Sequence, residues 1–127
     1  MQFTVLIAED EPLIAMDLTM QVEDLDHQVM GPCKRVADLR RMLCSELPDC
    51  AVLDVRLDDG EVFEVADRLA AHNIPFLFHS GHANGWELKS RYPDAVICPK
   101  PSSPSNLERH LKMLFEKVEH TQPRTPA

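Results

Sequence analysis

The sequence lacks the features that mark several large classes of protein. Its 127 residues contain 13 Lys and Arg against 21 Asp and Glu, which gives a net charge of −8 at pH 7. Nonspecific nucleic-acid binding depends on a basic surface, so we expect no nucleic-acid partner. No apolar run approaches the ~20 residues that a membrane-spanning helix needs. We therefore expect no membrane segment.

Paired cysteines and targeting signals are missing as well. The four cysteines are scattered without Cys-x-x-Cys spacing, at Cys33, Cys44, Cys50 and Cys98. This favours reduced, mostly buried thiols over a disulfide framework or a zinc site. The first residues lead directly into an apolar segment, with no basic stretch, apolar core and small-residue cleavage site of a secretory signal. We expect a cytoplasmic protein.

Five short apolar runs are typical of strands that are covered on both faces. They occupy residues 3–8, 28–30, 50–54, 74–79 and 95–98. The second run is the weakest, and Gly31-Pro32 is expected to end it. The first run leads into Pro12, a residue that suits the first turn of a helix because its missing N–H costs nothing there.

Apolar residues at helical spacing predict a helix after each run. The predicted helices begin at Pro12, span 36–47, 62–69 and 83–92, and begin again after Ser103-Pro104. Pro48 is expected to end the second helix. The fourth is the poorest, because Gly85 interrupts it. We expect its Trp86 and Tyr92 to pack within the protein rather than to stack on a ligand.

Strands that alternate with helices indicate a doubly wound parallel α/β sheet with right-handed crossovers. Five strands favour a flavodoxin-like (CheY-like) fold with strand order 2-1-3-4-5 in a single domain. We expect this domain to cover residues 1–119. The polar residues 120–127 include Pro123 and Pro126 and are expected to form a flexible C-terminal tail.

Polar residues follow four of the predicted strands. Glu9 and Asp10 come after the first, Asp54 after the third, Ser80 after the fourth and Lys100 after the fifth. The carboxyl ends of parallel strands meet at one edge of the sheet, where α/β proteins bind ligands. We therefore expect carboxylates, a hydroxyl and an ammonium group to converge there.

This combination indicates phosphoryl chemistry. Two carboxylates ~4 Å apart repel by about 4 kcal/mol at an effective dielectric of ~20, so the cluster favours protons or a divalent cation. An all-oxygen acidic site suits Mg²⁺. Asp54 beside Mg²⁺ can attack a phosphoryl donor, and Ser80 and Lys100 can bind the remaining phosphoryl oxygens.

With these residues in this order, the sequence resembles the receiver domain of two-component response regulators over about residues 3–118. The resemblance implies that Asp54 accepts the phosphoryl group, with Ser80 as the switch hydroxyl and Lys100 as the phosphoryl-binding ammonium. It also implies a cis peptide bond at Lys100-Pro101.

The resemblance further implies a set of Mg²⁺ ligands. Asp10 and Asp54 would bind the ion directly, the backbone carbonyl of Arg56 would supply a third ligand, and Glu9 would act through water. Residues 54–57, 60–61 and 78–82 are similar to a receiver subfamily with a Phe-Ala-Thr-Gly-type motif (FAT-GUY-like), whose members are often stand-alone.

Two positions depart from the common receiver pattern. Asp58 replaces a Pro that often follows the phosphoacceptor by four residues, and Ile97 replaces an aromatic switch residue. We expect the weak fourth helix, with Gly85 and its flanking loop, to move in place of that aromatic. His79 and His82 are too few for a metal site, and we expect them to flank the phosphoacceptor.

The resemblance implies a signalling protein rather than an enzyme. Its donor would be a sensor histidine kinase or histidine phosphotransfer protein. Its signal would leave through phosphorylation-dependent binding of a downstream partner to the surface from the fourth to the fifth helix, or through onward phosphotransfer. A phosphorylation-independent interaction module is the alternative. A haloacid-dehalogenase-like phosphatase also uses an aspartyl phosphate, but Arg56 stands where its second acid is normally found. Taken alone, Asp54 could also be a simple helix cap or turn former.

Overall fold

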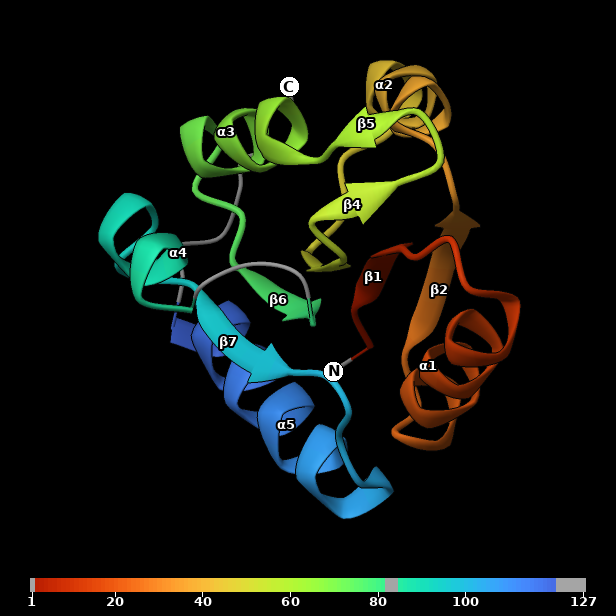
Figure 1. The fold of residues 1–127 in the computed structure, drawn as a ribbon. Helices are drawn as coiled ribbons and strands as arrows, with labels where there is room; N and C mark the ends of the chain where they lie inside the picture. Colours follow the sequence, from red (N-terminus) through yellow and green to blue (C-terminus); the bar gives the residue numbers. More distant parts are fainter. Residues whose placement is uncertain (1, 82–84, 121–127) are drawn as a thin grey trace.

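A five-stranded parallel sheet forms the centre of the protein in the computed structural model, which describes residues 2–81 and 85–120 (Figure 1). The strand order is β2-β1-β3-β6-β7. The strands are β1 (Thr4–Ala8), β2 (Gln28–Cys33), β3 (Cys50–Leu53), β6 (Phe76–Ser80) and β7 (Val96–Pro99). Since β6 and β7 are the fourth and fifth strands of the sheet, the predicted flavodoxin-like order is confirmed.

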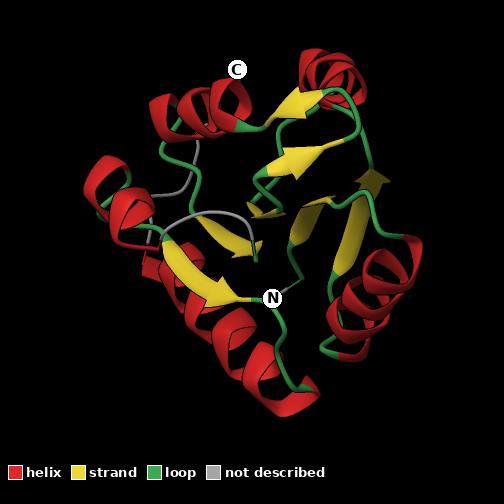
Figure 2. Ribbon diagram, viewed as in Figure 1, coloured by secondary structure: helices red, strands yellow, loops and turns green. Residues whose placement is uncertain are grey.

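Helices cover both faces of the sheet (Figure 2). One face carries α1 (Pro12–Asp24) and α5 (Pro104–His120), and the other carries α2 (Val36–Ser45), α3 (Phe63–Ala71) and α4 (Gly85–Arg91). Successive strand residues point to opposite faces. Leu6 accordingly packs in the core cluster with Leu39 and Leu69, while Ile7 packs in the cluster with Leu18 and Leu111. The continuous apolar runs of the sequence reflect this coverage on both sides.

The second strand is longer than predicted. β2 continues through Gly31 and Pro32, which were expected to end it, and reaches Cys33. It pairs only with β1 and lies at the edge of the sheet, where a proline that cannot donate a hydrogen bond is tolerated. The register shifts between Leu6 and Ala8 at this point. Gly31 has φ +100°, and a Cβ there would lie 2.9 Å from the Cys33 nitrogen, so a glycine is needed.

The second helix is shorter than predicted, because α2 ends at Ser45 rather than at residue 47. Glu46 is already extended, with φ −154° and ψ 142°. A proline disfavours the helical conformation for the residue before it, so Pro48 excludes Leu47 from the helix. Leu47 is 37% exposed and lies outside both core clusters.

The loop predicted around Gly60 contains a small antiparallel hairpin, β4 (Arg56–Leu57) with β5 (Gly60–Glu61) (Figure 1). Asp59 lies at its turn and accepts hydrogen bonds from the N–H groups of Val36 and Ala37 at 2.6 and 3.1 Å. The carboxylate therefore caps α2 from a distant segment, since Arg35 at the N-cap makes no such bond.

The fourth helix differs from its prediction at its end and in one side chain, since α4 ends at Arg91 rather than at residue 92. Tyr92 is buried as expected, but Trp86 is 75% exposed and does not pack in the interior. The predicted start of this helix at Ala83 lies outside the described residues. The last helix reaches His120, one residue into the predicted tail, and residues 121–127 also lie outside the described part.

All four cysteines lie within the described residues and carry free thiols, as predicted. Cys33, Cys50 and Cys98 are buried, and Cys44 is exposed. None of the helices within residues 2–81 and 85–120 is both long enough and apolar enough to cross a membrane.

Replacing Tyr92 with Phe is expected to lower the free energy of unfolding by about 1–2 kcal/mol. The Tyr92 hydroxyl donates a 2.5 Å hydrogen bond to Asp67 Oδ1 and joins the end of α4 to α3. Its ring packs against Phe76 and Phe78 and is retained in the variant. Urea denaturation of Tyr92→Phe, Asp67→Ala and the double variant tests this. If the free-energy losses of the two single variants simply add in the double variant, the two side chains do not share a stabilising bond.

Candidate functional site

The predicted acidic residues meet at the carboxyl edge of the sheet. β1 and β3 are neighbours in register, with Ala8 opposite Leu53, and the Asp54 N–H donates to the Ala8 carbonyl at 2.9 Å. The chain therefore leaves both strands at the same level. Glu9, Asp10 and Asp54 each offer a carboxylate oxygen, and these oxygens lie within 4.8 Å of one another.

The ammonium group of Lys100 lies between two of these carboxylates. Its Nζ is 2.8 Å from Glu9 Oε1 and 2.9 Å from Asp54 Oδ2. The Lys100 N–H donates to the Ser80 carbonyl at 3.2 Å, which ties the end of β7 to the end of β6. The Lys100-Pro101 peptide bond is cis, as the resemblance implied. Sequence reasoning brought Lys100 to the site but did not anticipate its ion pair with Glu9.

Burial makes it costly for the carboxylates of this cluster to carry their negative charges. Glu9 and Asp54 are each only 2% exposed. Burial raises the pKa of Glu9 to about 7, although Lys100 and the Glu11 N–H oppose the shift by bonding to its carboxylate. Burial lowers the pKa of Lys100, but its bonds to Glu9 and Asp54 outweigh this and leave it above the usual value. One ammonium group thus faces two buried acids.

The donor set fits a hard divalent cation. Within the described chain, no group donates a hydrogen bond to Asp54 Oδ1, although this oxygen is buried. A buried oxygen without a partner is costly unless an ion or a reacting atom meets it. Among the described residues, the cluster combines three carboxylates with the one ammonium group of Lys100. It therefore offers the oxygen ligands and the excess negative charge that suit Mg²⁺.

The other predicted residues lie around this cluster. Ser80 is buried at the end of β6, and Arg56 lies in β4, two residues after Asp54. The roles of the Ser80 hydroxyl and the Arg56 carbonyl stay predictions. His79 is buried beside Ser80, and its Nε2 lies 3.0 Å from Ser102 Oγ. His82 lies outside the described residues. A histidine at a fully apolar strand position was the signal that could have pointed to the Ser102 contact.

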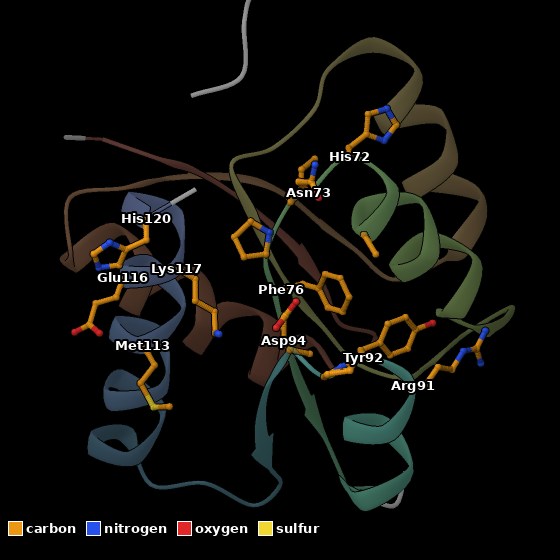
Figure 3. Close-up of a pocket in the computed structure, with 15 residues that line it drawn as sticks. His72, Asn73, Phe76, Arg91, Tyr92, Asp94, Met113, Glu116, Lys117 and His120 are labelled. Carbon is orange, nitrogen blue, oxygen red and sulfur yellow. The ribbon is translucent and has the colours of Figure 1, made fainter. Parts of the chain in front are cut away.

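A hollow of about 1020 Å³ is lined by residues that do not belong to this cluster, and Figure 3 shows its lining side chains. Its wall includes Phe76 at the start of β6, Arg91 at the end of α4 with Tyr92 directly after it, and Met113 and His120 on α5. These residues lie at the amino ends of the strands, whereas Asp54 follows the carboxyl end of β3. The hollow is therefore separate from the acidic cluster, whose Glu9 and Asp54 carboxylates are buried at the carboxyl edge of the sheet.

Comparisons with known proteins identify the family to which this fold and this cluster of residues belong. No family model matches the chain. The phyllosphere-induced regulator PhyR of Methylorubrum extorquens is 33% identical over 106 residues, which cover 81% of this chain. The chain spans 40% of the length of that relative. The match therefore concerns one part of a longer regulator.

Two solved structures match over nearly their whole length. SdrG from Sphingomonas melonis is 35% identical, with a TM-score of 0.74 and coverage of 88% of this chain and 95% of that one. A response regulator receiver protein from Sinorhizobium medicae is 27% identical, with a TM-score of 0.77 and coverage of 91% and 94%. These receiver-domain relatives are signalling proteins, and the two solved structures share the fold of this chain. The chain belongs to the receiver domains of response regulators.

Proposed function

We propose that this receiver accepts a phosphoryl group on Asp54 from a sensor histidine kinase or a histidine phosphotransfer protein, with Mg²⁺ as the cofactor. The observation that carries the proposal is the environment of Asp54. One of its oxygens is held by Lys100, and the other is buried without a partner beside the carboxylates of Glu9 and Asp10. Such a carboxylate is fixed in place and still has a lone pair for a phosphorus atom.

The transfer is a displacement at phosphorus. An oxygen of Asp54 attacks the phosphorus of a phosphohistidine, a P–O bond forms as the P–N bond breaks, and the departing imidazole takes up a proton. The Lys100 ammonium, 2.9 Å from Asp54 Oδ2, is close enough to offset charge on the phosphoryl oxygens. Mg²⁺ held by Asp10 and Asp54, with the Arg56 carbonyl and with Glu9 through water, would neutralise the remaining charge.

The test is intact-mass analysis after incubation with acetyl phosphate or a phosphorylated histidine kinase. With Mg²⁺ we expect a mass gain of one phosphoryl group, which peptide mapping assigns to Asp54, and with excess EDTA we expect none. A gain that persists in EDTA, or that maps to another residue, would contradict the proposal.

The signal is expected to leave through the surface formed by α4, β7 and α5. Trp86 on α4 is 75% exposed and Met113 on α5 is 45% exposed, so this surface offers large apolar side chains to a protein partner. The same surface would also serve the alternative, a phosphorylation-independent interaction module. Partner binding that is equally tight for the wild type and for Asp54→Asn would favour that alternative.

We infer that the protein is cytoplasmic and that it belongs to the FAT-GUY-like receivers. The hairpin at residues 56–61 and the sequence Phe78-His79-Ser80-Gly81 at the end of β6 support the second assignment. The receiver domain would span residues 1–119. It acts as a stoichiometric phosphoryl acceptor that loses the group slowly to water, rather than as an enzyme that turns over a substrate.

A further inference from the structure

A buried histidine lies beside the site without belonging to the carboxylate cluster. His79 is 4% exposed and directly precedes Ser80 at the end of β6. Its Nε2 shares a 3.0 Å hydrogen bond with Ser102 Oγ. Ser102 belongs to the loop between β7 and α5, two residues after Lys100. The contact therefore joins a strand of the sheet to the loop that carries the ammonium group of the site.

This loop is anchored to its own sheet on both sides of Pro101. Before it, the Lys100 N–H donates to the Ser80 carbonyl. After it, the Ser102 hydroxyl shares a hydrogen bond with the His79 ring. His79 and Cys98 are themselves paired in register across β6 and β7. Two successive residues of β6 thus fix the loop at positions 100 and 102.

Placing the His79 ring in the interior costs free energy. Its Nδ1 is buried, and nothing in the described part of the chain forms a hydrogen bond with it. Burial of such a polar atom costs free energy that an apolar side chain would not. Burial and the nearby Lys100 lower the pKa of His79 to about 4, so the ring is neutral at pH 7. A neutral ring can hold the loop without adding a positive charge against Lys100.

We propose that His79 and Ser102 form a positioning pair for Lys100, which holds its ammonium group where it meets the phosphoryl group on Asp54. Lys100 reaches both carboxylates through a flexible four-carbon stem, so its geometry depends on where the loop fixes its backbone. A displacement of about 1 Å at a reacting centre is enough to slow a reaction severely. This inference rests on the proposed function, but the second part of its test does not require phosphoryl transfer.

The first part of the test measures the rate of phosphoryl incorporation from acetyl phosphate with Mg²⁺. Ser102→Ala is expected to slow it about five- to tenfold, the equivalent of one hydrogen bond. Ser102→Thr keeps the hydroxyl and is expected to restore the rate. In a Lys100→Met background Ser102→Ala is expected to have no further effect, because the pair acts through that lysine.

The matched control is Ser103→Ala. Ser103 Oγ accepts a hydrogen bond from the Asn106 N–H at the start of α5, so its loss lowers stability without touching His79. This variant is expected to react at the wild-type rate. Slowing by Ser103→Ala as large as that by Ser102→Ala would overturn the proposal, since it would assign the effect to stability alone.

The second part measures acylation of the Lys100 amine by acetic anhydride, followed by peptide mass spectrometry. Its two ion pairs protect this amine, and we expect about fivefold faster labelling in Ser102→Ala and in His79→Leu, but not in Ser103→Ala. Unchanged labelling in both variants would overturn the positioning role. If the wild type accepts no phosphoryl group, the proposed function fails, while this labelling still decides whether the pair positions Lys100.

Discussion

Asp54→Asn is expected to reduce phosphoryl incorporation by a factor on the order of 10⁶, which is below detection, as for removal of other essential nucleophiles. The amide keeps the size of the side chain but lacks the charged oxygen that attacks phosphorus. The Glu9–Lys100 ion pair stays in place, so we expect the variant to fold with no loss of stability. Intact-mass analysis with acetyl phosphate and Mg²⁺, together with urea denaturation, measures both quantities.

Asp49→Asn is the matched control for this substitution. Asp49 lies at the opposite edge of the sheet, directly before β3, and its Oδ2 accepts a hydrogen bond from the Thr4 N–H at 2.8 Å. An asparagine oxygen can accept the same bond. We expect Asp49→Asn to be labelled like the wild type. Labelling of Asp54→Asn to a similar extent would show that another residue accepts the group.

The convergence of the acidic residues could be predicted because it depends on topology alone. Once the apolar runs are assigned to parallel strands in the order 2-1-3-4-5, the first and third are neighbours. Residues that directly follow them, such as Glu9 and Asp54, must then lie side by side. The prediction of Lys100 at the same edge has the same basis, since β7 runs parallel to the others.

The features that were missed depend on contacts between distant side chains. The carboxylate of Asp59 caps α2 from 23 residues away, and no local pattern around Val36 reveals this. The ion pair of Lys100 with Glu9 depends on the path of the loop after β7, which composition does not specify. Trp86 was assigned to the interior because large aromatic residues usually bury most of their surface, yet it lies on the outer side of a seven-residue helix.

Lys100→Met is expected to lower the free energy of unfolding by about 3–5 kcal/mol at pH 8, the cost of removing one partner from a buried ion pair. The variant leaves the carboxylates of Glu9 and Asp54 buried together without their shared ammonium group. Methionine fills nearly the same volume as the lysine stem, so the loss of packing is small. Denaturation in urea at constant ionic strength measures the effect.

The same substitution is expected to cost less at pH 6 than at pH 8. Burial already raises the pKa of Glu9 to about 7, and Lys100 is one of the groups that hold it down. Without Lys100 the folded state binds a proton at Glu9 more tightly than the unfolded chain does, so stability falls as pH rises above the unfolded value near 4.5.

Mg²⁺ supplies positive charge to the same carboxylates and should recover part of the loss. Lys89→Met is the control, because Lys89 is exposed and donates to the Ala95 carbonyl rather than to a carboxylate of the cluster. An equal loss in both lysine variants, or a larger loss at pH 6, would contradict the electrostatic role of Lys100.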